Sequence, residues 1–252
     1  MKTLLEVKNL CKTYATDGTQ NHVLSNVNLT VKEGEFIGIM GASGSGKSTL
    51  LYCLSGMTRA TSGEVFYGGA DICKMKEKEL TKLRVGDFGF VFQQMNLVPN
   101  LTMRENVAVP GYLNKSEKKS SVDQRAGELL SAVGIAEVAD HTPSGTSGGQ
   151  QQRCAIARGL INAPKILFAD EPTGALNRSA SKDVLNLLTH FNNEGQTIFL
   201  VTHDTKTAVR SSRLLYIEDG NIKGELTFPP YTESEEKARE AQLNAWLTSL
   251  NW

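Results

Sequence analysis

A glycine-rich loop directly after a short apolar run constrains this chain more than any other feature. The apolar run spans residues 35–40 (EFIGIM), and the loop GASGSGKST follows at residues 41–49. The loop fits the pattern G-x-x-x-x-G-K-[ST], which requires a strand before it and a helix after it. Residues 48–57 (STLLYCLSGM) have the character of such a helix. The sequence therefore predicts a phosphate-binding loop between a buried strand and a helix.

The residue types in this loop suit a nucleoside triphosphate. Glycines let backbone amides converge on phosphate oxygens, and the N-terminal end of the following helix carries partial positive charge. Lys47 supplies a point charge for the β- and γ-phosphates, Ser48 offers a hydroxyl to Mg²⁺, and Thr49 lies toward the α-phosphate. The predicted nucleotide-binding residues of the loop are Gly41, Ala42, Ser43, Gly44, Ser45, Gly46, Lys47, Ser48 and Thr49.

Strand and helix patterns alternate along the chain, which predicts an α/β fold. Residues 88–93 (FGFVFQ), 165–171 (KILFADE) and 197–204 (TIFLVTHD) are short apolar runs that end in polar residues. Runs of this kind are typical of central parallel strands. Helical periodicity follows the strands, over residues 116–139 and 150–160.

Three further segments have the pattern of antiparallel strands. Residues 4–10 (LLEVKNL) predict a first strand, and alternation of apolar and polar residues over 27–32 predicts a half-buried strand. Residues 214–226 (LLYIEDGNIKGEL) predict a hairpin around the Asp-Gly pair at positions 219 and 220.

Polar side chains end three of the predicted parallel strands. Asp170 can hold Mg²⁺ through water, and the adjacent Glu171 can polarise an attacking water; the alternative is a pair of solvated loop acids. His203 alone would be a core residue, but beside a phosphate loop we expect it to contact a γ-phosphate. Gln93 can ligate Mg²⁺ or orient water. These expectations follow because ligands bind at the carboxyl ends of parallel strands.

A second anion-binding pattern lies far along the chain from the first. Residues 146–160 (TSGGQQQRCAIARGL) place a Ser-Gly-Gly turn at the start of a helix, where amides, a hydroxyl and the helix dipole can bind an anion. One nucleotide does not need both devices from one chain. A head-to-tail homodimer would place each ATP between one chain's loop 41–49 and the other chain's residues 147–150.

Taken in order, these motifs resemble those of the ATP-binding cassette (ABC) family over nearly all of residues 1–226. The resemblance implies a P-loop NTPase with a RecA-like core, an N-terminal antiparallel β subdomain and an α-helical subdomain at roughly residues 94–158. It also implies an ATPase whose dimer closes on ATP and reopens after hydrolysis. The family's functional positions match Tyr14 (adenine stacking), the loop 41–49 (Walker A), Gln93 (Q-loop), Ser147, Gly148, Gly149 and Gln150 (signature), Asp170 (Walker B), Glu171 (catalytic base) and His203 (switch histidine).

Two positions depart from the family pattern. Thr146 stands where the signature usually has leucine, and a β-branched residue there is expected to hold the turn. Asn177 stands where the loop that crosses the family's dimer interface usually ends in aspartate. This second change keeps polarity but removes a charge, which puts the usual coupling across the dimer in doubt.

The segments 41–51, 88–110 and 170–177 are most similar to the macrolide-exporter and lipoprotein-release branch, and GALN to bacitracin and lantibiotic resistance transporters. The resemblance implies a separate FtsX-like permease, with residues 95–109 near the groove that receives its coupling helix. It also implies antimicrobial peptide resistance or export as the function. The alternatives are a lipoprotein-release or macrolide-type ATPase and a non-transport switch of the FtsE-like kind. A P-loop kinase is disfavoured by the signature.

Composition argues against a nucleic-acid-binding protein and against a membrane-spanning or secreted one. Lys+Arg and Asp+Glu both number 27 in 252 residues, so the basic excess expected of a nucleic-acid binder is missing. No window approaches about 18 consecutive apolar residues, and the N-terminus lacks a long apolar region. We therefore expect a cytoplasmic protein, held at the cytoplasmic face of the cell membrane by its permease. The four cysteines have no metal-ligand spacing, so we expect buried or incidental thiols.

The residues after position 228 are predicted to form a separate element. The family pattern is expected to occupy residues 1–228, and residues 229–252 a C-terminal amphipathic helix. Thr232 and Glu235 have the spacing of a capping box. The helix has apolar residues at i, i+3, i+4 and i+7: Leu243, Trp246, Leu247 and Leu250. It is expected to dock on its own domain, and the alternative is a partner or a membrane surface.

Overall fold

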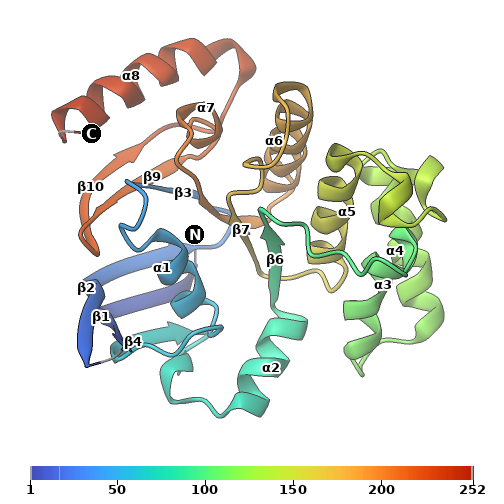
Figure 1. Cartoon of the computed structure of the whole chain (residues 1–252), viewed down its shortest axis with the longest axis horizontal. Helices are drawn as coiled ribbons and strands as arrows, with labels where there is room; N and C mark the ends of the chain where they lie inside the picture. The colour runs from blue at the N-terminus through green and yellow to red at the C-terminus, as the bar shows by residue number, and fades with distance from the viewer. Residues whose placement is uncertain (1, 17, 251) are drawn as a thin grey trace. The chain divides into compact units, whose positions relative to one another are not determined.

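The structure, a computed structural model, describes residues 2–16, 18–250 and 252. The chain divides into two compact units, the first comprising Met1–Leu80 with Thr197–Trp252 and the second Thr81–Gln196. Figure 1 shows the elements of both units along the chain. None of the helices in the described part combines the length and the apolar character that a bilayer crossing requires.

The first unit contains a four-stranded antiparallel sheet in the order β2-β1-β4-β5. Its strands are β1 (Thr3–Thr16), β2 (Thr19–Lys32), β4 (Ser62–Tyr67) and β5 (Ala70–Asp71). In β2 the apolar residues Val27, Leu29 and Val31 are buried and alternate with more exposed polar ones, as predicted. The sheet therefore has one face in the core, which the period of two requires.

Four more strands of the first unit lie in the order β10-β9-β3-β8. They are β3 (Phe36–Met40), β8 (Thr197–Val201), β9 (Arg213–Glu218) and β10 (Asn221–Thr227). β3 is parallel to both β8 and β9, and every residue of β3 and β8 is buried. This confirms the buried parallel strands, and the antiparallel pair β9–β10 confirms the hairpin.

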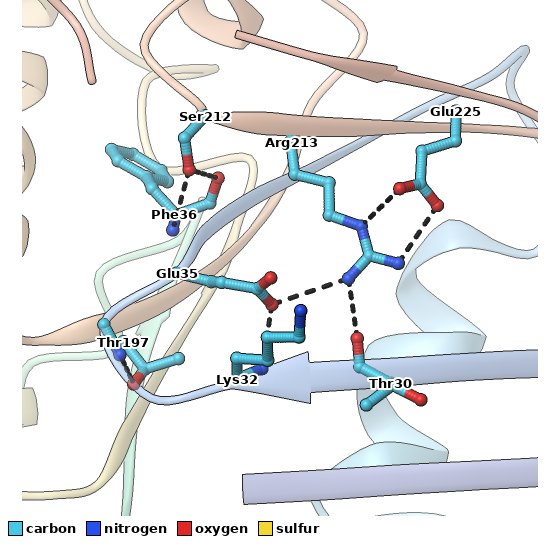
Figure 2. Close-up of polar contacts among 9 residues, drawn as sticks. Thr30, Lys32, Glu35, Phe36, Thr197, Ser212, Arg213 and Glu225 are labelled. Carbon is cyan, nitrogen blue, oxygen red and sulfur yellow. Dashed lines mark hydrogen bonds and ion pairs between the residues drawn. The ribbon is translucent and has the colours of Figure 1, made fainter. Parts of the chain in front are cut away.

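An arginine cross-links strands of the first unit (Figure 2). The guanidinium group of Arg213 on β9 binds both carboxylate oxygens of Glu225 on β10, at 2.8 and 3.0 Å. It also donates to the carbonyl of Thr30 on β2 at 2.6 Å and lies 3.5 Å from the carboxylate of Glu35. One side chain thus joins the antiparallel sheet to the hairpin.

The helices of the first unit are α1 (Lys47–Leu54), α7 (Thr205–Ala208) and α8 (Glu236–Ser249), with short 3₁₀ turns at Ile72–Lys74 and Glu233–Glu235. The predicted capping box at Thr232 is wrong. Its side chain makes no cap hydrogen bond, because the 3₁₀ turn η4 (Glu233–Glu235) intervenes and α8 begins only at Glu236. The predicted docking of the tail helix is confirmed, since Leu243 and Leu247 are buried in the unit's own core.

The second unit contains the parallel pair β6 (Phe88–Phe92) and β7 (Ile166–Asp170). Its helices are α3 (Met103–Leu113), α4 (Lys119–Ala132), α5 (Gly148–Leu160) and α6 (Arg178–Asn193), with 3₁₀ turns at Ala136–Val138 and Pro143–Gly145; α2 (Glu77–Gly86) spans the unit boundary in sequence. The helix predicted over 116–139 is shorter, because Gly134 adopts φ 68° and a left-handed glycine ends a helix.

The cysteines are free thiols, as expected. All four are free, and Cys53 on α1 and Cys154 on α5 are buried. Burial raises the pKa of Cys53 and of Cys154 to about 12, so both stay protonated near neutral pH.

Candidate functional site

The glycine loop leaves β3 and enters α1 with backbone conformations that favour glycine. Gly46, the N-cap of α1, has φ 103°, and a Cβ there would lie 2.6 Å from the carbonyl oxygen of Val23. A Cβ on Gly41, at φ 155°, would lie 2.1 Å from the carbonyl of Ile217. Both contacts are closer than real Cβ atoms make, so neighbouring backbone fixes the loop's path and restricts these positions to glycine.

The start of α1 has the properties of an anion site. Gly46 provides no side-chain cap, and the first turn carries no acidic residue. The hydroxyl of Ser45 is buried and has no hydrogen-bond partner among the described residues. Lys47 is 8% exposed, and its ammonium donates to the carbonyls of Gly41 and Ala42 at 2.8 and 2.7 Å. A phosphate would satisfy the hydroxyl and amides and neutralise the ammonium, so the loop fits a nucleotide's phosphates.

The first unit brings His203 to the strand edge where this loop begins. β3 and β8 are in register, with Ile39 opposite Val201, and Thr202 donates to the carbonyl of Ile39 at 3.1 Å. Gly41 and His203 each lie two residues beyond the paired positions, so the loop and the histidine leave adjacent strands at the same edge. His203 is exposed. Its alternative interpretation as a buried core histidine is therefore wrong.

Tyr14, the predicted adenine-stacking residue, lies on β1 and is 39% exposed. The ammonium of Lys12 stands 4.5 Å from the centre of its ring and donates to the carbonyl of Arg59 at 2.9 Å. A cation beside an aromatic ring is attracted to its electron-rich face. The tethered lysine therefore restrains the tyrosine ring, a contact that the sequence analysis did not anticipate.

In the second unit, two predicted site residues follow paired strands. Phe92 of β6 lies opposite Asp170 of β7, so Gln93 and Glu171 leave the sheet at the same edge. Asp170 is only 8% exposed, which excludes the alternative that it is a solvated loop acid. Glu171 has φ 48°, a strained conformation for a residue other than glycine, and such strain is concentrated at functional sites.

The amide of Gln93 lies against the segment that follows Glu171. A Cβ added to Gly174 would stand 2.8 Å from Gln93 Nε2. The strand edge of the second unit thus gathers a buried carboxylate, a second carboxylate and an amide. Mg²⁺ is usually bound by one or two carboxylates together with water and substrate phosphates, so this set suits it.

The Ser-Gly-Gly turn opens α5 as predicted, and it forms a capping box that the sequence analysis missed. The hydroxyl of Ser147 accepts from the backbone N–H of Gln150 at 3.3 Å, and the Gln150 side chain accepts from the Ser147 N–H at 2.9 Å. The S-x-x-Q spacing could have revealed it. The turn lines a hollow of about 360 Å³ together with the loop before α6 and the first turns of α6. The lining residues are Ser147, Gly148, Gly149, Arg153, Ala175, Leu176, Asn177, Ser179, Ala180 and Asp183.

The two departures from the family pattern each have a local role. The hydroxyl of Thr146 donates to the carbonyl of Pro143 at 2.8 Å, so threonine holds the turn before Ser147. Asn177 is the N-cap of α6, and its side-chain oxygen accepts from the N–H of Ala180 at 3.0 Å. Asparagine and aspartate cap helices about equally well, so the substitution leaves the start of α6 intact.

Helix α5 also holds the segment around Gln93, through residues that the sequence analysis did not single out. Gln152, which is fully buried, donates to the carbonyl of Phe92 at 3.2 Å. Arg158 donates to the carbonyls of Met95 and Asn96 at 2.6 and 2.7 Å. The helix that begins at the Ser-Gly-Gly turn therefore binds the chain on both sides of Gln93.

This geometry defines a nucleoside-triphosphate-binding α/β protein with a second anion-binding turn. The family model described as ABC transporter matches residues 24–174, more than half of the chain. The chain therefore belongs to the ABC transporter family.

Individual relatives agree with this assignment. The chain is 39% identical over 249 residues to the macrolide export ATP-binding/permease protein MacB of Pasteurella multocida (strain Pm70), a match that covers 99% of this chain and 38% of the relative. This chain thus spans well under half the length of that protein.

Solved structures show the same fold. The dimeric ATP-binding cassette MJ0796 in a post-hydrolysis state, bound to ADP and Pi, is similar with a TM-score of 0.83, 40% identity, and coverage of 90% of this chain and 100% of that chain. A second dimeric structure of MJ0796, described as a bacterial ABC transporter cassette, has a TM-score of 0.83, 41% identity and the same coverage. The predicted α/β cassette fold is confirmed, and the chain has the fold of an ABC ATPase domain.

Proposed function

We propose that this chain is the ATP-hydrolysing subunit of an ABC transporter and that it works as a homodimer beneath a separate membrane permease. The supporting observation is the presence of two anion-binding devices in one chain, the loop at residues 41–49 and the turn at Ser147. The dimeric form of the similar cassette MJ0796 supports a shared site. Each ATP would lie between the loop of one chain and residues 147–150 of the other.

The residues take complementary roles in this proposal. Tyr14 stacks on adenine, and the loop with Lys47 binds the phosphates. Ser48, Gln93 and Asp170 would hold Mg²⁺, which neutralises developing charge on the phosphates when bound. The remaining roles belong to Glu171, which orients and deprotonates the attacking water, and His203, which contacts the γ-phosphate.

We further propose that the domain division follows the family, with a cassette at residues 1–228 that includes a helical subdomain near 94–158, and a C-terminal helical extension at 229–252. The permease partner is of FtsX-like type, residues 95–109 lie near the groove that receives its coupling helix, and the protein is peripheral to the membrane through it. Support comes from the relative MacB, whose name combines an ATP-binding part with a permease. Resistance to or export of antimicrobial peptides is the proposed role, and it rests on the likeness of residues 174–177 (GALN) to the bacitracin and lantibiotic resistance transporters. The alternatives are lipoprotein-release or macrolide-type export and an FtsE-like switch.

Capture of the partner tests this proposal. The Glu171→Gln chain carries an affinity tag and is isolated with Mg²⁺ and ATP from native membranes, beside a Lys47→Ala chain as the nucleotide-free control. We expect a multi-span permease with a large extracellular domain, enriched over the control. Capture of a soluble or single-span protein instead would favour the non-transport switch.

A further inference from the structure

The C-terminal helix α8 packs against the two segments that lead into the nucleotide site of the first unit. Leu243 and Leu247 of α8 belong to one core cluster with Met40, Ala208 and Val209. Met40 directly precedes the phosphate loop, and Ala208 ends the short helix α7 that follows His203. Figure 1 shows α8 beside α7. Helix α8 therefore packs in the same core as the end of β3 and the helix α7 that follows His203.

A buried arginine fixes the contact between α8 and α7. Arg239 is 3% exposed and donates to the carbonyl of Val209, the C-cap of α7, at 2.9 Å. It also donates to the carbonyl of Pro229 and lies 4.9 Å from the centre of the Phe228 ring. Burial lowers the pKa of Arg239, although it stays charged at neutral pH. The two carbonyls accept from its terminal nitrogens, and the carboxylate of Glu235 lies 3.9 Å from its Nε, so these groups determine the position of the buried cation.

Helix α7 is thus held at both of its ends. At the N-terminal end, Asp204 accepts from the N–H groups of Lys206 and Thr207 and from the Thr207 hydroxyl. Asp204 is the residue after His203, and its own N–H donates to the hydroxyl of the buried Thr202. At the C-terminal end, the partner is Arg239. A displacement at Val209 therefore passes through a single turn of helix to the residue next to His203.

We propose that Arg239 is a positioning residue for His203, and that α8 serves as a built-in brace for the switch histidine. The proposal rests on the γ-phosphate contact assigned to His203 above. Arg239 bonds the carbonyl of Val209 and not the phosphate loop, so loss of its donors should disturb the histidine and leave ATP binding intact. The tail then acts on turnover within its own chain.

The test compares Arg239→Met, which keeps an unbranched stem but removes the donors, with Lys237→Met on the exposed face of the same helix. The chain has four histidines, so the imidazole resonances can be assigned by NMR from single substitutions. In Arg239→Met we expect a displaced or broadened His203 resonance, a kcat for ATP lower by about tenfold and a KM within about twofold of the parent. Lys237→Met should change none of these.

Arg239→Lys provides the conservative comparison. Lysine can donate to one of the two carbonyls but lacks the planar fork that reaches both, so a smaller displacement of the same resonance is expected. This variant also decides the matter if Arg239→Met fails to fold: a displaced His203 resonance supports the proposal, and one identical to the parent overturns it.

The remaining outcomes separate the brace from the function on which it rests. A lower melting temperature in Arg239→Met, with an unchanged His203 resonance and unchanged kcat, would show that Arg239 is structural only and overturn the brace. A displaced resonance in a chain whose parent hydrolyses no ATP would retain the brace and reject the proposed function. The NMR measurement does not depend on turnover.

Discussion

Lys47 and Gly41 are joined by a hydrogen bond of 2.8 Å from the lysine ammonium to the glycine carbonyl. The ammonium is thereby held inside its own loop, beside the first turn of α1. A cation fixed at a helix N-terminus adds to the positive end of the helix dipole, and the combination favours a bound phosphate. The loop is thus organised around the charge it is proposed to bind.

The first prediction concerns this charge. Lys47→Ala should weaken ATP binding by at least about tenfold, because a charge-assisted contact to the phosphates is lost. Titration with a fluorescent ATP analogue measures the dissociation constant, and Lys82→Ala, at an exposed position on α2, is the control. Unchanged ATP affinity in Lys47→Ala would contradict the assignment of this loop.

The second prediction uses the contact between Gly174 and Gln93. In Gly174→Ala the new methyl group would stand 2.8 Å from the Gln93 amide, which must move aside. We expect kcat to fall several-fold while the free energy of unfolding changes by less than about 1 kcal/mol, since the displaced atom ends a flexible side chain. In the control Gly145→Ala the nearest atom to the new Cβ is 4.0 Å away. Equal turnover in both variants would exclude a catalytic role for the position of Gln93.

The third prediction concerns the hold of α5 on the segment after Gln93. Arg158→Lys loses the fork that binds the carbonyls of Met95 and Asn96. Amide hydrogen exchange over residues 94–102 should then become about tenfold faster. Arg125→Lys is matched to it, because Arg125 on α4 donates to the carbonyl of Ile161, the C-cap of α5, and not to residues 94–102. Similar exchange in the two variants would show that Arg158 does not restrain this segment.

The fourth prediction concerns the network in Figure 2. Arg213→Met removes the bidentate pair with Glu225 and leaves the carbonyl of Thr30 without this donor. We expect the free energy of unfolding to fall by about 2 kcal/mol, since Arg213 is 17% exposed and its bonds are charge-assisted. Denaturant titration gives this quantity. A loss below about 0.5 kcal/mol would mean that the cross-link contributes no more than an exposed ion pair.

Local patterns in the sequence were sufficient to predict the strand ends and the polar residues that follow them. Each apolar run before Gly41, Asp170 and His203 is continuous and short. Burial and strand type could therefore be deduced from the run itself. The lengths of β1 and β2 could not, because both strands contain irregular residues, Asn9 and Asn26, with positive φ. Such bulges interrupt the alternation on which strand prediction depends.

Other features depend on contacts between distant residues. The carbonyls held by Arg158 and Arg239 lie 62, 63, 30 and 10 positions away along the chain. Their spacing gives no periodic pattern, so side-chain type alone could not indicate the contacts. The wrong prediction at Thr232 has a different cause. The capping-box spacing is present in the sequence, but residues 233–235 form a 3₁₀ turn and not the first turn of the α-helix.

In the proposed mechanism two chains close on ATP, and Glu171 then activates the attacking water. Sedimentation of Glu171→Gln with Mg²⁺, with and without ATP, measures the first step, and phosphate release from the same samples measures the second. Glu128→Gln, at an exposed position of α4, is the control. We expect a stable dimer that forms only with ATP and releases almost no phosphate. A Glu171→Gln chain that binds ATP yet stays monomeric, or that releases phosphate at the parent's rate, would contradict it.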